Sequence, residues 1–234
     1  MYVIFSTLFN KHNWTIPASW NYKVSIALDF GCGDNPRNPF IAENLFGLDI
    51  VGVENYTLKY TKTSLDESVN FKKIITKRGQ KLPFKDNFFD AITLYDVIEH
   101  LSREPQGNSN EFIETMNELS RVLNVGGILL AITPAFPSPA SFQDPTHINI
   151  ITEFTYHYFV GDKAPATLLG YGFKGSFEMI DQFWVGPQNK LMGTDNSVKK
   201  NLIHSFSKMI RYPRATLSAF RKPTHLVWLM KKVN

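Results

Sequence analysis

The stretch 23–33, KVSIALDFGCG, joins a short apolar and β-branched run, Lys23 to Phe30, to a turn that contains Gly31 and Gly33. A run of this kind that stops at a glycine is typical of a buried strand that leads into a tight turn. Open α/β sheets bind ligands at the carboxyl ends of such strands, where glycines let the backbone approach a ligand closely. We therefore predict a first core strand with a ligand site directly after it. The alternative is a plain tight turn without a ligand.

The same turn argues against two kinds of nucleotide site. A dinucleotide-binding turn needs a third glycine at the G-x-G-x-x-G spacing, and Pro36 occupies that position, which disfavours NAD. A phosphate-binding loop would be followed by Gly-Lys-Ser or Gly-Lys-Thr, and neither follows here. A nucleoside ligand without phosphates remains compatible with the turn.

Further strands and a helix follow the first strand. The apolar runs predict strands over Asn44–Val53, Phe71–Thr76, Phe88–Tyr95 and Ile128–Thr133, with an amphipathic helix over Asn110–Val122. Alternating strands and helices with short connections predict an α/β fold with a doubly wound, mostly parallel sheet and right-handed crossovers.

The C-terminal part of the chain has a different pattern. Glu153–Leu169 is predicted to be helical, whereas Gly175–Val185 and Thr224–Lys231 alternate as strands do. We expect the latter two to pair antiparallel at the C-terminal edge of the sheet.

Asp49 is the candidate for a ribose-binding carboxylate, because it stands at the end of the second predicted strand. Glu54 is a competing candidate, since that strand could run on through Val51 and Val53. A third interpretation of Asp49 is a solvated loop acid.

Composition limits the class of protein. A chain of 234 residues with 43% hydrophobic and 20% charged residues is an ordinary globular sequence with room for one α/β domain. No apolar run approaches the ~20 residues that span a bilayer, and Met1–Asn10 lacks the features of a signal peptide, so we expect a cytoplasmic protein. Cys32 is the only cysteine, which excludes an internal disulfide and a multi-cysteine zinc site. No set of Asp, Glu and His at ligand spacing in the sequence predicts a metal.

Positive charge is concentrated between residues 190 and 222, where Asp195 is the only acid among eight lysines and arginines. Apolar residues interleave with these charges at helical spacing. Such a segment suits an anionic membrane surface, a phosphorylated carrier or nucleic acid. The alternative is a helix that packs its apolar face on its own domain.

Several motifs together resemble class I S-adenosylmethionine-dependent methyltransferases of the type 11 kind. The motifs are Asp29-Phe30-Gly31-Cys32-Gly33, Gly47-Leu48-Asp49, Leu82 to Asp90, Glu99-His100-Leu101, and Arg121-Val122-Leu123 with Gly126-Gly127. They cover residues 25 to 135 in the order and spacing of that family.

The resemblance implies a cofactor, S-adenosyl-L-methionine, with its amino-acid and sulfonium part near the first turn, its ribose on the second-strand acid and its adenine at the loop of residues 78–82. The implied contacts are Asp29, Gly31, Gly33, Asp49, Gln80, Tyr95 and Asp96. Gln80 departs from the family, whose members often carry an acid in that loop.

The resemblance also implies a three-layer Rossmann-like sandwich with a seven-stranded sheet. We predict a single methyltransferase domain over 1–234, with a cofactor-binding core over 24–135 and an acceptor-side loop, helix and strand over 136–185. A basic insertion over 186–223 precedes the last strand.

Two histidines are candidates for acid–base chemistry. Methyl transfer mainly requires alignment of the reacting atoms in a site with little water, but a hydroxyl acceptor benefits from a general base. His147 follows the fifth strand in a loop that could close over an acceptor, so we rank it first, and His100 second. For each, the alternative is a histidine that only orders its loop.

The acceptor is expected to be an oxygen of a small molecule or glycan, including a lipid-linked or surface-polysaccharide saccharide, so that the enzyme acts in the cytoplasm or at the membrane periphery. Cys32 is not placed as a nucleophile, and the base-amine motif of Asn or Asp with Pro-Pro is missing after the fourth strand. The alternatives are an RNA methyltransferase that uses residues 190–222, with nucleic acid the less favoured partner, and a catalytically silent cofactor-binding protein.

Overall fold

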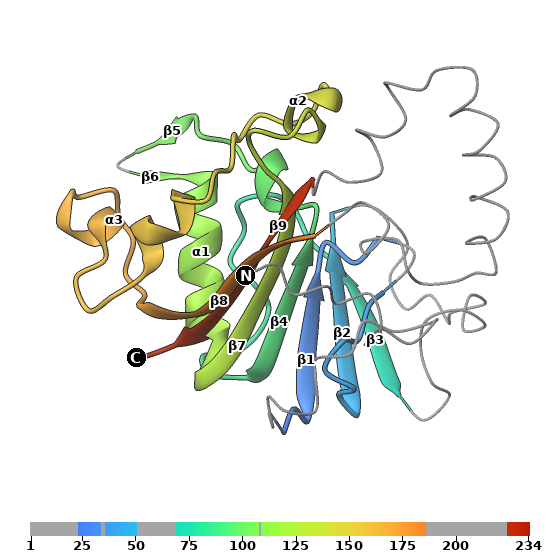
Figure 1. Cartoon of the computed structure of the whole chain (residues 1–234). Coiled ribbons are helices and arrows are strands. Elements are labelled where there is room, and N and C mark those ends of the chain that lie inside the picture. The colour runs from blue at the N-terminus through green and yellow to red at the C-terminus, as the bar shows by residue number, and fades with distance from the viewer. Residues whose placement is uncertain (1–22, 34–35, 51–68, 108, 186–223) are drawn as a thin grey trace, which may run out of the picture.

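The computed structural model describes residues 23–33, 36–50, 69–107, 109–185 and 224–234. Within them one seven-stranded sheet has the order β3-β2-β1-β4-β7-β9-β8 (Figure 1). Its strands are β1 (Ile26–Phe30), β2 (Asn44–Asp49), β3 (Asn70–Ile75), β4 (Phe89–Tyr95), β7 (Leu123–Pro134), β8 (Phe177–Val185) and β9 (His225–Lys232). The pairs from β3 to β7 are parallel, and β9 is antiparallel to both β7 and β8. A separate two-stranded ribbon pairs β5 (Pro105–Gln106) with β6 (Ser109–Asn110).

The central strands of the sheet are buried on both faces. On one face Leu28, Ile92 and Trp228 belong to a core cluster that also contains residues of the helical segments. On the other face Ala27 and Ala91 belong to a second cluster. Apolar residues on both faces are typical of parallel strands in a covered sheet. The predicted Rossmann-like α/β class with a mostly parallel sheet is therefore confirmed.

Helix α1 (Glu111–Val122) forms where the apolar spacing predicts it. The Asn110 side chain caps it by accepting a 3.0 Å hydrogen bond from the Ile113 amide. Phe112, Met116 and Leu119 point into the first core cluster, which fixes the rotation of the helix against the sheet. Four short helices complete the described chain: η2 (Ile98–His100), α2 (Ala140–Gln143), η3 (Thr155–Phe159) and α3 (Pro165–Leu168).

The predicted helix over Glu153–Leu169 is wrong. The segment contains two separate short helices, η3 and α3. Between them Val160 forms a bridge with Phe177, and Gly161 has a φ of +95°, a backbone conformation that ends a right-handed helix. Pro165, which fits the first turn of a helix, then begins α3.

Two other boundaries differ from the sequence prediction. Strand β2 ends at Asp49, and β7 begins at Leu123, earlier than the predicted Ile128. The antiparallel pair at the C-terminal edge, β8 with β9, is confirmed. Residues 186–223, which include the basic segment, lie outside the described residues, as do Val51, Val53 and Glu54. Among the helices of the described chain, none is long and apolar enough to cross a membrane.

Candidate functional site

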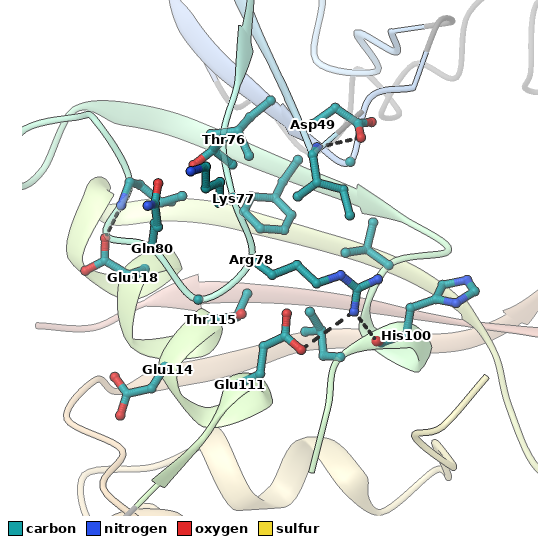
Figure 2. A pocket seen from close by; sticks show the side chains of 18 of the residues that line it. Asp49, Thr76, Lys77, Arg78, Gln80, His100, Glu111, Glu114, Thr115 and Glu118 are labelled. Atoms are coloured by element: carbon teal, nitrogen blue, oxygen red, sulfur yellow. Dashed lines mark hydrogen bonds and ion pairs between the residues drawn. The ribbon is translucent and has the colours of Figure 1, made fainter. Parts of the chain in front are cut away.

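A cavity of about 560 Å³ opens at the carboxyl edge of the parallel strands (Figure 2). The ends of β1, β2 and β4 form one side of it, and the loop after β3 and one face of α1 form the other. Its volume is that of a pocket for a nucleoside-sized ligand. Of the site residues predicted from the sequence, Gly31, Asp49, Gln80, Asp96 and His100 line it.

The turn after β1 depends on Gly31. Its φ is +76°, and its amide donates a 2.7 Å hydrogen bond to the carbonyl of Leu48 on β2. A Cβ atom at this position would lie 2.4 Å from Cγ2 of Val97. Glycine is therefore required here by both the backbone conformation and the contact with the segment after β4.

Asp49 connects the end of β2 to the same turn. Its Oδ2 accepts a 2.7 Å hydrogen bond from the Gly33 amide, and its Oδ1 accepts one of 2.7 Å from the Ile50 amide. The Lys73 ammonium donates to the Gly33 carbonyl at 2.6 Å, which holds the turn from the side of β3. Asp49 is thus a carboxylate on the wall of the cavity that two backbone amides hold in place.

Asp29 and Tyr95 lie beneath this surface and do not line the cavity. The Asp29 carboxyl is fully buried, accepts hydrogen bonds of 2.8 Å from the Arg37 amide and the Thr93 hydroxyl, and has its pKa raised to about 6 by burial. The Arg37 guanidinium lies 4.3 Å from the centre of the Tyr95 ring. In the described chain the Tyr95 hydroxyl is buried without a hydrogen-bond partner, and burial raises its pKa.

Asp96 directly follows β4 and lies in the left-handed region, with a φ of +53°, while its amide donates to the Ile132 carbonyl at 2.9 Å. Its Oδ1 lies 3.4 Å from Nε2 of His225, the first residue of β9. A strained non-glycine residue on a cavity wall is a frequent feature of functional sites.

The loop of residues 78–82 after β3 was predicted as part of the site, but the polar wall that α1 contributes opposite the strand ends was not predicted from the sequence. Glu111, Glu114, Thr115 and Glu118 line the cavity from α1. Figure 2 shows the Arg78 side chain extending toward His100 and Glu111. Its guanidinium donates to the His100 carbonyl at 3.1 Å and lies 3.7 Å from Glu111 Oε2. Polar residues spaced three and four apart on the helix were the signal that could have revealed this face.

Both predicted histidines belong to one cluster with Glu99. The rings of His100 and His147 meet edge to face, with centroids 4.7 Å apart, and His147 Nε2 lies 4.0 Å from Glu99 Oε1. The Glu99 carboxylate is buried, and its Oε2 accepts a 2.9 Å hydrogen bond from the Thr133 hydroxyl. His100 lines the cavity, whereas His147 lies outside its lining.

Comparisons with known proteins agree with this architecture. Residues 28–131 match the family model described as a methyltransferase domain. An uncharacterized protein of Methanocaldococcus jannaschii is 29% identical over 119 residues, which are 48% of this chain and 42% of that protein. The chain therefore spans less than half the length of this relative.

Two solved structures share the fold at low sequence identity. A methyltransferase of Haloferax volcanii in complex with the activator Trm112 is 12% identical, with a TM-score of 0.55 over 90% of this chain and 83% of that one. A proposed sarcosine dimethylglycine methyltransferase of Galdieria sulphuraria is 17% identical, with a TM-score of 0.52 over 90% and 78%. These two structures show that the chain has the same fold, and residues 28–131 are similar to the methyltransferase domain family.

Proposed function

We propose that this protein transfers a methyl group from S-adenosylmethionine to an oxygen of a small molecule or a glycan, such as a lipid-linked or surface-polysaccharide saccharide. The observation that carries the proposal is His100, which lies on the cavity wall and contacts a second imidazole, His147, beside the buried Glu99 carboxylate. Hydroxyl acceptors must lose a proton, and a histidine at the reacting site is suited to accept it.

The cavity fits the cofactor by size and by chemistry. Asp49 offers a carboxylate to the ribose hydroxyls, and the loop with Gly79 and Gln80 offers polar atoms to the adenine. Gly31 and Asp96 line the part of the wall that belongs to β1 and β4. Three predicted cofactor contacts, Asp29, Gly33 and Tyr95, do not line the cavity: Gly33 lies in the turn after β1, and the other two lie beneath the cavity wall. We keep their contacts with the cofactor as a proposal.

When bound, S-adenosylmethionine supplies a methyl group on a positively charged sulfur. Transfer to a hydroxyl forms a carbon–oxygen bond, breaks the carbon–sulfur bond and releases the hydroxyl proton. The protein has to align the acceptor and exclude water. The cluster of Glu99, His100 and His147 is the part of the described site that can receive the proton.

The cofactor assignment is tested by calorimetric titration of S-adenosylmethionine and of NAD. We expect the wild type to bind the methyl donor and not NAD, and Asp49→Ala to weaken donor binding by about tenfold or more, as the loss of a hydrogen-bonded carboxylate does. Asp181→Ala is the matched control, because exposed Asp181 also accepts from the next amide, that of Gln182 at 2.8 Å. Equal affinities of the two variants would exclude Asp49 as the ribose ligand.

The acceptor class is tested with labelled donor and a panel of free sugars, lipid-linked saccharides, small hydroxylated molecules and RNA. Transfer to hydroxyls of saccharides or small molecules supports the proposal. Transfer to RNA alone would replace it with the RNA-methyltransferase alternative. Donor binding without transfer to any acceptor would support the catalytically silent protein instead.

We further propose that the basic segment 190–222 brings the protein from the cytoplasm to anionic membranes. This proposal rests on the sequence, since the segment lies outside the described residues. The test is co-sedimentation with anionic vesicles at low and high salt. Binding that salt weakens supports it, and no sedimentation at low salt removes it.

A further inference from the structure

The strands β4 and β7 are neighbours and parallel, so the segments that follow them meet at one edge of the sheet. Helix η2, with Glu99 and His100, follows β4, and the loop with His147 follows β7. The ligand-capable atoms of Glu99, His100 and His147 all lie within 4.8 Å of one another. From this cluster we propose that the protein binds one divalent transition-metal cation, with zinc as the representative ion, through Glu99, His100 and His147.

Backbone carbonyls lie near Nδ1 of both imidazoles. Nδ1 of His147 lies 3.3 Å from the Ser141 carbonyl, and Nδ1 of His100 lies 3.2 Å from the Thr146 carbonyl. The Thr146 hydroxyl also lies 3.1 Å from Nδ1 of His100. In the neutral tautomer in which Nδ1 donates to the carbonyl, Nε2 keeps its lone pair for a cation. Metal-binding histidines are usually oriented by such a hydrogen bond to the second ring nitrogen.

The carboxylate is oriented in the same way. The Thr133 hydroxyl donates to Glu99 Oε2, and Glu99 Oε1 points toward His147 Nε2 at 4.0 Å. Ligand atoms around a tetrahedral zinc ion are about 3.3 Å apart, given bonds of ~2.0 Å. Small rotations of the side chains therefore bring the observed atoms to a common cation.

The backbone that carries the three ligands is fixed independently of the side chains. The amides of Ile148 and Asn149 donate to the Glu99 carbonyl at 3.0 and 2.9 Å, which ties the His147 loop to η2. Asp144 accepts from the amide and the hydroxyl of Thr146, at 2.8 and 2.6 Å, and so closes the turn before His147. Supporting contacts of this kind make a metal site selective.

The donor set decides which cations fit. Magnesium and calcium prefer oxygen ligands, whereas two imidazoles and one carboxylate suit zinc, cobalt or manganese. Three protein ligands leave a fourth position open. Because His100 also lines the cavity, this open position can take the acceptor hydroxyl. A bound cation would then replace the two histidines as the group that promotes loss of the hydroxyl proton: it would lower the pKa of the hydroxyl, whose proton would pass to water. The catalytic role rests on the proposed function, and the binding site rests on the geometry alone.

The test uses the untagged full chain after treatment with a chelator. We expect calorimetry to show one equivalent of Zn²⁺ bound, much weaker binding of Mg²⁺, and a visible absorption spectrum of a cobalt complex with nitrogen and oxygen ligands. Glu99→Gln, His100→Gln and His147→Gln should each weaken Zn²⁺ binding by about tenfold or more. His157→Gln is the control, because His157 is an exposed histidine of η3 that stacks on Tyr156; it should leave binding unchanged.

Thermal unfolding of the metal-free variants shows which of them fold. If Glu99→Gln does not fold, the histidine variants decide the question. No stoichiometric binding by the wild type, or binding that all folded variants retain, overturns the proposal and leaves a hydrogen-bonded cluster. Zinc binding without methyl transfer to any hydroxyl would reject the proposed function and keep the site. The opposite outcome would reject the metal site and keep the proposed function: methyl transfer is unchanged after chelator treatment, and the wild type and all variants bind zinc equally.

Discussion

Asp29 is a carboxyl group that the fold buries completely under the turn after β1. Its hydrogen bonds from the Arg37 amide and the Thr93 hydroxyl favour the charged form, but burial has the larger effect and raises the pKa from 3.8 to about 6. The folded protein therefore holds a proton on Asp29 at pH values where the unfolded chain has released it.

We predict that the stability of the wild type relative to Asp29→Asn falls as the pH rises from 4 to 7. Because the folded pKa is the higher one, the contribution of Asp29 is complete below about pH 4 and is lost as the pH passes through about 6. A shift of this size corresponds to about 3 kcal/mol. Urea denaturation of both proteins at pH 4, 5 and 7 measures the difference, and a difference that does not change with pH would show that Asp29 is ionised throughout.

Helix α1 holds the loop that carries the predicted adenine site. Arg121, in its last turn, donates to the carbonyls of Leu82 and Phe84 at 3.1 and 2.8 Å and pairs with Asp86 and Glu118 at 2.7 Å. Glu118 in turn accepts from the Leu82 amide at 2.7 Å. These bonds raise the pKa of Arg121 and lower that of Glu118. The Arg121 guanidinium therefore holds the first part of the motif Leu82 to Asp90, from Leu82 to Asp86, against the end of α1.

Replacement of this guanidinium tests its importance for the loop. Arg121→Met keeps the length of the side chain but leaves two backbone carbonyls without their donor and removes the ion pairs with Asp86 and Glu118, so we expect a loss of about 2–4 kcal/mol in the free energy of unfolding. Lys174→Met, at an exposed position, removes the same charge and should change stability by less than about 0.5 kcal/mol. Denaturant unfolding of both variants measures these values, and similar losses would point to net charge as the cause.

Much of the element order was predictable, because apolar runs report buried strands and spacing reports an amphipathic helix such as α1. Asp49 and the Gly31 turn were also predictable, since they follow strands directly. The helix over 153–169 was not, because Gly161 and Pro165 divide a stretch whose composition suits a helix. The Glu99, His100 and His147 cluster was hidden as well: His147 is far along the chain from the adjacent pair Glu99 and His100, and they meet because β4 and β7 are neighbours.

At the scale of the whole molecule, strand β9 completes the core. Its residues Leu226 to Met230 are fully buried between β7 and β8, with Trp228 the largest of them. The Trp228 Nε1 atom is buried and has no hydrogen-bond partner in the described part of the chain. The indole therefore stabilises the fold through packing, whereas burial of its N–H without a partner lowers the stability.

We predict that Trp228→Phe costs much less stability than Trp228→Ala. The alanine variant leaves a large cavity, which costs about 3–5 kcal/mol, whereas phenylalanine fills most of the space and removes the unpaired N–H. Chemical denaturation of the two variants gives both values. Equal losses of stability in the two variants would mean that Nε1 of Trp228 donates a hydrogen bond that both variants remove.

The position of β9 also affects how the chain is made. A ribosome synthesises β7 long before β9, and among the strands that the structure describes β8 pairs in the sheet with β9 alone. The nascent chain therefore carries an open β7 edge while the intervening segment is translated, and open edges are templates for pairing with other chains. Chaperones that bind unfolded chains and shield this edge should therefore raise the yield of native protein more than compounds that stabilise only the folded protein.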